Sequence, residues 1–359
     1  MEETIAESAS IGFIISGLLI GVIFGFILQR GRYCANTAFR DIIFINDFSM
    51  FRAYLLALVI MIVGGNILND LGLFKLMPQT FYPLANIFGG YIFGMGMVLA
   101  GGCGSGVWYR SGEGQVGAWG AILGFLIGAS ATTNGILNPL YNSLRSFSVS
   151  IADKRNATLW QIFSDDMTTK WVVIVMLAII AAIVILKGKP FSLGKQKGFY
   201  WSVTGLLIGI MGIVTFWASN YWGGAARGLN FTTPSAELLN VIVSGDTKSL
   251  FFAEYEYRLG PFELTWIIFT VIGVPIGAYL SAKALKEFRW KIPAAKEFIT
   301  VLLGGFLMGF GGILGGGCTV GQALTGVTTL SIGSIVATIF MILGNWTMVY
   351  FKFIKPMKD

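Results

Sequence analysis

Three cysteines stand in three glycine-rich stretches of this 359-residue chain. Cys34 lies in GRYCANTAFR, Cys103 in AGGCGSGVWYRSGEG and Cys318 in GGGCTVGQALTG. A thiol buried in a low-dielectric interior stays protonated, because the charged thiolate would lose its hydration, and it then offers a weak S–H donor and a polarisable sulfur atom. Such a group suits loose contact with an anion that exposes a soft sulfur atom.

Other residue types limit the chemistry. The chain has no histidine, and no two of its cysteines have CxxC spacing. The commonest ligand of zinc and haem and the usual proton shuttle near neutral pH are therefore missing. We expect no metal site, no cofactor and no enzymatic centre.

The composition predicts an integral membrane protein. Hydrophobic residues make up 55% of the chain and charged residues 12%, with a mean hydropathy of +0.73. Soluble domains carry about 25% charged residues. We predict an all-α polytopic protein in which residues 1–359 form a single transmembrane transport domain. The expected membrane-spanning helices, about nine in number, are 11–28, 51–69, 84–101, 116–133, 171–186, 199–217, 264–282, 298–314 and 331–351.

Aromatic and basic residues suggest how these spans sit in the bilayer. Trp171, Trp201, Trp266 and Trp346 lie near span ends, where interfacial anchoring would place them. Of the 25 Lys and Arg residues, 17 fall on the face that carries the C-terminus and 8 on the other. The positive-inside rule then puts the C-terminus in the cytoplasm and the N-terminus outside. Basic residues spread in this way give no reason to expect nucleic-acid binding.

The chain contains two distant copies of one pattern. SGLLIGVIFGF in the first span is echoed by TGLLIGIMGIV in the sixth. We predict two repeats, at about 11–134 and 199–351, linked by the spanning helix 171–186. Because five crossings separate their starts, the second copy enters from the opposite face. Inverted repeats place a central site near the membrane midplane, and glycine-interrupted segments at matching positions point to it.

Hydrophobicity lapses after four of the spans. The lapses follow Gly101 and Gly315, and two more occur at GRYCANTAFRDIIFI and NYWGGAARGLNF. We interpret these stretches as re-entrant half-helices, since irregular backbone at membrane depth must be buried in protein or line a wet cavity. Cys34, Cys103 and Cys318 occupy three of these stretches. In the fourth, Gly223, Gly224 and Ala225 stand at the position where a cysteine would be expected.

A half-helix that begins near the midplane presents free N–H groups and the positive end of its dipole to an anion. Arg32 and Arg110 lie near the breaks and add fixed charge at the expected cytoplasmic mouths, although both also suit ordinary positive-inside anchors. Ser105, Thr319 and Gln322 are further candidates to contact anion oxygens. Because the spans hold almost no carboxylates, passage of an anion fits better than a proton relay.

At these motifs the sequence resembles the YeeE/YedE sulphur-transport family over about residues 12–351. The resemblance implies a bacterial inner-membrane protein with an hourglass shape that takes up thiosulfate for sulfur assimilation. It also implies three essential cysteines, carried over by motif to Cys34, Cys103 and Cys318, and a cytosolic partner resembling a TusA sulfur carrier. The predicted topology orders them from outside to inside as Cys318, Cys103 and Cys34, so we hypothesise a relay that holds the anion at each thiol in turn.

Three alternatives remain open. The substrate could be a selenium compound or another sulfur-containing anion, which the cysteine motifs do not distinguish. The protein could be a membrane sulfurtransferase that forms a cysteine persulfide, with Cys34 between Arg32 and Arg40 as the candidate nucleophile. It could also be a subunit that anchors a soluble enzyme through its basic loops at 187–198 and 283–296. Whichever function holds, the glycines could serve only to pack the helices together, without lining a path.

Overall fold

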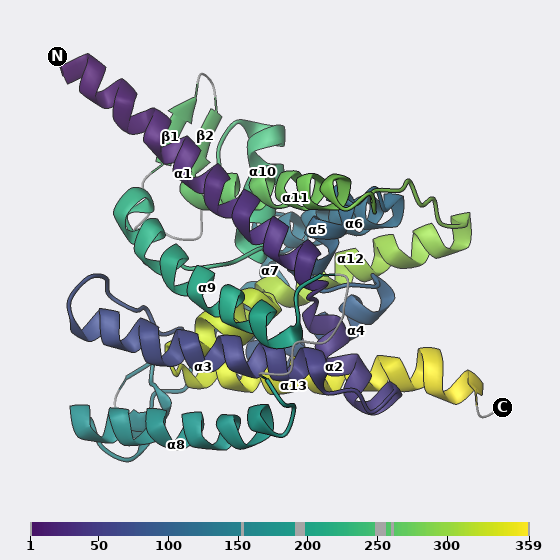
Figure 1. Ribbon diagram of the computed structural model, residues 1–359. Coiled ribbons are helices and arrows are strands. Elements are labelled where there is room, and N and C mark those ends of the chain that lie inside the picture. The colour runs from purple at the N-terminus through teal and green to yellow at the C-terminus, as the bar shows by residue number, and fades with distance from the viewer. Residues whose placement is uncertain (1, 152–153, 191–197, 248–255, 260–261, 358–359) are drawn as a thin grey trace.

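A computed structural model describes residues 2–151, 154–190, 198–247, 256–259 and 262–357. Long helices make up most of the fold (Figure 1). They are α1 (Glu2–Gly31), α3 (Ser49–Asp70), α4 (Pro83–Leu99), α6 (Val116–Thr133), α8 (Met167–Leu186), α9 (Trp201–Gly223), α11 (Trp266–Ala284), α12 (Ala295–Gly315) and α13 (Ile332–Val349).

Short helices and one hairpin join them. The short helices are α2 (Ala35–Phe44), α5 (Gly104–Gly112), α7 (Asn138–Arg145), α10 (Thr232–Ser244) and the short 3-10 or π segments η1 (Leu159–Ile162), η2 (Thr319–Gly326), η3 (Tyr350–Ile354) and η4 (Lys355–Met357). The strands β1 (Glu256–Leu259) and β2 (Phe262–Thr265) pair antiparallel, with Glu256 opposite Thr265. This hairpin is the one departure from the expected all-α fold within the described residues.

Nine segments are long and apolar enough to cross a membrane, counted over the described part of the chain. This number confirms the sequence prediction. The bounds of α6 match the predicted span 116–133. The helix α1 begins nine residues before its predicted start, the helix α9 ends six residues after its predicted end, and every other helix end lies within four residues of its prediction. The two ends of the chain lie at opposite ends of the bundle (Figure 1).

Two of the tryptophans expected at membrane interfaces lie inside the protein. Trp266 is 2% exposed, and its indole Nε1 donates a 3.0 Å hydrogen bond to Ser16 Oγ on α1. Trp201 is also buried. Position near a span end therefore did not make these two rings interfacial anchors, because neighbouring helices extend far enough to cover them.

Glycines allow the helix backbones to touch. A Cβ at Gly21 or Gly25 of α1 would overlap the carbonyl oxygens of Thr270 and Val274 on α11, and one at Gly277 would overlap the carbonyl of Val22. The glycines of α12 meet α4 and α6 in the same way: a Cβ at Gly305 would overlap the carbonyl of Ala121. Small residues let membrane helices gain dispersion contacts that lipid tails would otherwise supply. Most glycines in the long helices thus serve packing.

The pattern of helix contacts is the same in the two halves of the chain. The helix α1 packs along α11, as α9 packs along α3. Likewise α4 packs along α13, as α12 packs along α6. In this scheme α1 corresponds to α9, α3 to α11, α4 to α12 and α6 to α13. When each helix is replaced by its counterpart, the contact of α1 with α11 becomes that of α9 with α3, and the contact of α4 with α13 becomes that of α12 with α6. The helix α8 lies outside this scheme.

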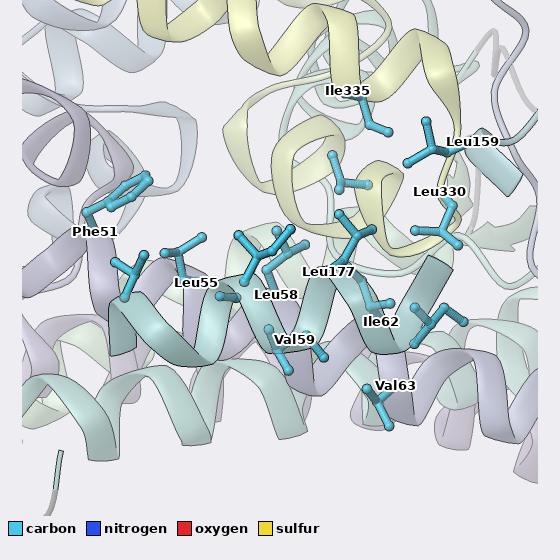
Figure 2. A pocket seen from close by; sticks show the side chains of 16 residues that line it. Phe51, Leu55, Leu58, Val59, Ile62, Val63, Leu159, Leu177, Leu330 and Ile335 are labelled. Carbon is cyan, nitrogen blue, oxygen red and sulfur yellow. The ribbon is translucent and has the colours of Figure 1, made fainter. Parts of the chain in front are cut away.

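The helix α8 is held at the margin of the bundle (Figure 1). Only 28% of an apolar stretch of 18 residues in this helix is buried, the smallest share among the nine candidate spans of the described chain. Its contacts are with α3 and η1, and an apolar pocket of about 410 Å³ separates parts of α8 from α3 (Figure 2). The other spans therefore form most of the core, to which α8 adds the buried side chains of Ala181 and Ile185.

Substitution of Gly277 tests the backbone contact between α1 and α11. We expect Gly277→Val to lower the free energy of unfolding by about 2 kcal/mol or more, because the new side chain meets main-chain atoms that cannot rotate away. Thermal unfolding of the detergent-solubilised protein measures the effect. Gly117→Ala is the control, since its Cβ would make only ordinary contacts with Pro293 and Val301. Equal melting temperatures for the two variants would contradict the assignment.

Candidate functional site

Each cysteine stands immediately before a short helix. Cys34, Cys103 and Cys318 are the N-cap residues of α2, α5 and η2, and all three have extended backbone angles there. All three are free thiols and fully buried. The predicted lapses in hydrophobicity are thus points at which one helix ends and another begins inside the protein.

Cys34 and Cys103 are in direct contact. Their Sγ atoms lie 3.5 Å apart in S–H···S hydrogen-bond geometry, and the backbone N–H of Cys103 donates to Cys34 Sγ at 3.4 Å. Cys103 Sγ lies 3.5 Å from Ser105 Oγ, so that hydroxyl continues the chain of polar contacts. Two thiols that are far apart in the sequence therefore form one site.

Cys318 meets the same helix start from another side. A Cβ at Gly104 would lie 3.1 Å from Cys318 Cβ and 3.4 Å from its Sγ. A Cβ at Gly106 would lie 2.7 Å from Cys34 Sγ and 3.3 Å from Cys103 Sγ. The first turn of α5, which carries no side chain at these two glycines, therefore has all three thiols against it.

The fourth break differs from its prediction. The helix α9 continues through Gly223 and ends where Gly224 adopts a left-handed backbone, and the chain then runs on to Phe231 before α10 begins. Phe231 is the N-cap of α10, and its Cβ would lie 3.6 Å from a Cβ at Gly104. Phe231, and not the expected Gly223 to Ala225, thus starts the fourth short helix beside the thiols.

The supporting polar residues fall into two kinds. The Thr319 hydroxyl is buried and has no hydrogen-bond partner among the described residues. Gln322 is also buried, but its amide Nε2 donates to Gly315 O and to Gln79 Oε1, both at 2.7 Å. Ser105 and Thr319 therefore have hydroxyls near the thiols, whereas Gln322 braces the turn that precedes Cys318.

Sequence reasoning missed several buried polar groups close to these helix starts. Tyr33 precedes Cys34, Trp108 lies on α5, and Thr232 follows Phe231. The Tyr33 hydroxyl, the Trp108 indole N–H and the Thr232 hydroxyl have no hydrogen-bond partner within the described chain. Leaving such groups unpaired costs about 1–3 kcal/mol each, so their positions favour a bound polar occupant.

The two candidate arginines lie in different surroundings. Arg110 of α5 donates to the carbonyl oxygen of Gly101 and lines a pocket of about 400 Å³, here called the inner pocket, together with Lys291 and Glu297. Arg32 is 60% exposed and forms a 2.9 Å ion pair with Glu287. Arg110 thus lies at a pocket beside the far end of α5, and Arg32 pairs at the surface.

The second arginine needed by the sulfurtransferase alternative is also engaged. Arg40 forms a 2.7 Å ion pair with Asp41, as Arg32 does with Glu287. In the part of the chain that the structure describes, neither arginine donates a hydrogen bond to Cys34. The flanking charges in the sequence therefore do not amount to a pair of cations directed at this thiol.

A second, narrower pocket of about 50 Å³, here called the outer pocket, reaches the turn after Cys318. Gln79, Arg227, Asn230, Gly321 and Thr325 are among its lining residues. The backbone N–H of Gly321 donates to Cys318 Sγ at 3.4 Å. The outer pocket therefore leads to the residues that hold Cys318.

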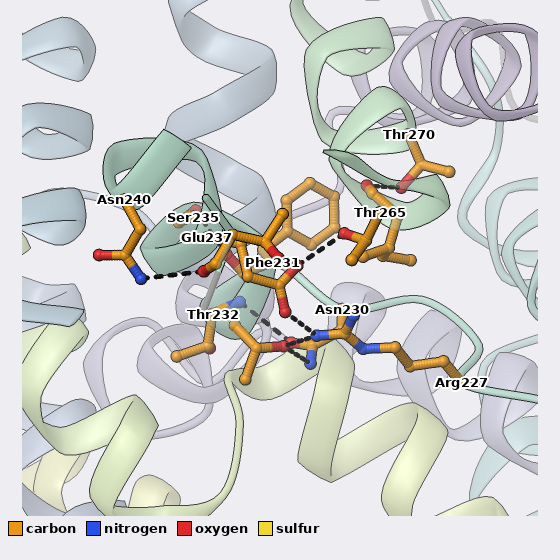
Figure 3. A network of polar contacts seen from close by, with 12 residues as sticks. Arg227, Asn230, Phe231, Thr232, Ser235, Glu237, Asn240, Thr265 and Thr270 are labelled. Atoms are coloured by element: carbon orange, nitrogen blue, oxygen red, sulfur yellow. Dashed lines mark hydrogen bonds and ion pairs between the residues drawn. The ribbon is translucent and has the colours of Figure 1, made fainter. Parts of the chain in front are cut away.

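Arg227 belongs to a buried polar network (Figure 3). It forms a 2.9 Å ion pair with Glu237, and the two side chains are only 2% and 3% exposed. Thr265 Oγ1 donates to the other carboxylate oxygen of Glu237 at 2.8 Å, and Asn230 Nδ2 donates to Thr233 Oγ1 at 2.8 Å. The signal in the sequence was a lone arginine within the glycine-rich lapse after α9.

A double-mutant cycle tests this network. We expect Arg227→Met to lower the free energy of unfolding by about 3 kcal/mol, because the Glu237 carboxylate stays buried after its guanidinium partner is removed. Arg227→Met combined with Glu237→Met should cost less than Arg227→Met alone. Thermal unfolding in detergent gives the comparison, and strictly additive losses would contradict it.

Comparison with known proteins identifies the family of this chain. The family described as Sulphur transport matches residues 30–347. The thiosulfate transporter TsuA of Escherichia coli (strain K12) is 33% identical over 353 residues, which cover 96% of each chain. The thiosulfate transporter TsuA of Spirochaeta thermophila is 31% identical over 344 residues, which cover 94% of this chain and 98% of the relative. The probable transporter YedE of Escherichia coli is 36% identical over 114 residues, 32% of this chain and 28% of its own. The chain therefore belongs to the YeeE/YedE sulphur-transport family.

Proposed function

We propose that this protein carries thiosulfate across the bacterial inner membrane along a path that passes the three buried thiols. Two relatives that match nearly the whole chain are named thiosulfate transporters. The observation that carries the proposal is the gathering of Cys34, Cys103 and Cys318 around Gly104 and Gly106. Membership of a transport family favours this function over the sulfurtransferase and anchoring alternatives.

The proposed path joins the two pockets. Thiosulfate enters the outer pocket beside Arg227 and Asn230, reaches Cys318 at Gly321, and passes the first turn of α5 to Cys103 and Cys34. It leaves along α5 toward Arg110 and the inner pocket. The fully buried thiols would form the constriction of the expected hourglass, with the inner pocket of about 400 Å³ and the outer pocket of about 50 Å³ as its two openings.

The thiols would hold the anion without a covalent step. Each protonated thiol offers an S–H donor, and the starts of α2, α5 and η2 offer backbone N–H groups and the positive ends of short dipoles. The unpaired hydroxyls of Tyr33 and Thr319 add donors. Neutral donors of this kind bind a dianion weakly enough to release it, as conduction requires.

The repeat architecture and orientation are part of the same proposal. The matching contacts of α1 with α11 and α9 with α3 support two repeats at about 11–134 and 199–351. Their opposite orientation follows from the five crossings that separate their starts. The four short helices α2, α5, α10 and η2 then act as re-entrant half-helices. The excess of basic residues on the C-terminal face supports a cytoplasmic C-terminus and an N-terminus outside.

Two alternative functions predict experimental results that differ from those of thiosulfate transport. A sulfurtransferase would leave a persulfide on a cysteine, which mass spectrometry after exposure to thiosulfate detects. Transport of a selenium compound would appear as uptake of that compound in place of thiosulfate. Delivery to a TusA-like carrier stays a prediction of the family resemblance, and residues 191–197 of one basic loop lie outside the described residues.

Substitution of Cys318 is the first test of function. We expect Cys318→Ala to reduce uptake of radiolabelled thiosulfate by about tenfold or more, the factor that corresponds to roughly 1.4 kcal/mol of lost interaction. Uptake is measured in cells lacking their own importers, at matched abundance in the membrane. Unchanged uptake would make Cys318 a packing residue, and no uptake by the wild type would overturn thiosulfate as substrate.

Gly106→Ala provides a second variant that keeps every thiol. Its Cβ would lie 2.7 Å from Cys34 Sγ, so we expect it to displace that sulfur and to lower uptake with Cys318 intact. Gly102→Ala is the matched control, because its Cβ would make contacts of 3.4 Å or more with Val107 and Gly106.

The order of the thiols is tested from each side of the membrane. In a Cys34→Ser, Cys103→Ser variant, Cys318 is the one remaining cysteine. We expect a membrane-impermeant thiol reagent to modify it from outside, and thiosulfate to slow the modification by occupying the same path. Labelling only from the cytoplasmic face would reverse the proposed order and orientation.

A further inference from the structure

The apolar pocket between α3 and α8 has no part in the proposed sulfur path. All sixteen side chains drawn around it are apolar, and they come mainly from α3 and α8 (Figure 2). Leu159, Val327, Leu330 and Ile335 close one end. The pocket lies between α3 and α8, the least buried of the nine candidate spans in the described part of the chain. It therefore needs an occupant that is apolar along its length.

The pocket is elongated along the helices. On α3 its lining residues run from Phe51 to Val63, which at 1.5 Å per residue corresponds to about 18 Å. One leaflet of the hydrocarbon core is about 15 Å deep, half of a 30 Å bilayer interior. On α8 the small side chains of Ala178 and Ala181 leave room between the helices. The pocket thus has the length and polarity of one lipid acyl chain.

Cations gather at one end of the pocket. Phe51 and Val184 line that end, and Arg52 Nε donates to the carbonyl oxygen of Val184 at 3.3 Å. The exposed Lys187 and Lys189 follow at the end of α8. None of Arg52, Lys187 and Lys189 forms an ion pair with another residue that the structure describes.

Among the described residues, the other end of the pocket carries no such excess of positive charge. There Lys170 of α8 is neutralised by a 2.6 Å ion pair with Asp70 of α3. Unpaired positive charge is therefore found at the end of the pocket lined by Phe51 and Val184. A lipid with its acyl chain in the pocket and its headgroup at this end would place its phosphate beside these cations. Basic residues close to the ends of membrane helices attract anionic lipid headgroups.

We propose that this pocket binds an anionic phospholipid, with an acyl chain between α3 and α8 and its phosphate near Arg52, Lys187 and Lys189. The lipid fills the space beside the direct contacts between α3 and α8, and so helps to hold the marginal helix in place. The occupant follows from the apolar lining and the one-sided charge together. It does not depend on the identity of the transported anion.

Native mass spectrometry of the full, delipidated protein in non-ionic detergent tests the proposal. Phosphatidylglycerol is added at increasing concentration, and phosphatidylcholine with the same acyl chains serves as the zwitterionic probe. We expect one phosphatidylglycerol to bind more tightly than phosphatidylcholine and to raise the melting temperature of the protein. Equal binding of the two lipids would overturn the proposed headgroup site.

Matched variants separate the headgroup from the acyl chain. We expect Lys187→Gln, Lys189→Gln to weaken phosphatidylglycerol binding by about 25-fold, roughly fivefold for each cation. Lys283→Gln, Lys286→Gln is the control, because it removes two exposed lysines at the end of α11. An equal loss in both pairs would indicate a general charge effect and overturn the site.

For the acyl chain, Ala178→Phe fills the pocket and should abolish one-to-one binding of phosphatidylglycerol. Ile183→Phe on the same helix is the control, since Ile183 is 54% exposed and does not line the pocket. Binding that survives Ala178→Phe in a protein with a normal melting temperature would overturn the proposal. So would a dimer mass for the wild type that Ala178→Phe converts to a monomer, because a second copy would then occupy the pocket.

Discussion

The close approach of three thiols to one helix start depends on the absence of side chains at Gly104 and Gly106. A single methyl group at Gly106 would collide with Cys34 Sγ, and one at Gly104 would press against Cys318. The Cys34 and Cys103 sulfurs can then lie 3.5 Å apart in a fully buried position. The rest of the fold keeps this small volume enclosed, since helix breaks are tolerated at membrane depth only where protein covers them.

The long helices supply that cover through backbone contact. In lipid the hydrophobic effect does not drive helices together, so association relies on close packing and on hydrogen bonds between them. The glycines of α1 and α11 bring carbonyl groups against Cα atoms, and those of α12 do the same toward α4 and α6. Side-chain bonds add specificity at the site: Asn345 Nδ2 donates to Asn36 Oδ1 at 2.7 Å, and Tyr54 donates to the carbonyl of Ala323 at 2.8 Å.

Charge is arranged differently on the two sides of the thiols. The outer pocket holds Arg227 already paired with Glu237, whereas the inner pocket combines Arg110 and Lys291 with Glu297. An unpaired buried cation in this small pocket would bind a dianion tightly and slow its release. The pairing of Arg227 with a carboxylate keeps its remaining hydrogen-bond donors and some positive potential, and it limits how tightly an anion is held. Both features fit a conduit better than a storage site.

The sequence by itself determined the membrane class, the nine spans and the cysteines as the residues at the breaks. These are local properties, because hydropathy over about 20 residues and the lapses in it depend on no distant partner. Three of the four breaks are therefore where the sequence predicts them, next to Cys34, Cys103 and Cys318.

Only the tertiary structure decided which residues meet. Cys34 and Cys103 are 69 positions apart, and no periodicity in the chain specifies that their sulfurs touch. The same holds for Phe231 at the start of α10, for the burial of Arg227 with Glu237 and for Trp266 against Ser16. Each depends on how helices from the two halves of the chain pack against one another, and that packing is fixed by backbone contacts between segments distant in sequence.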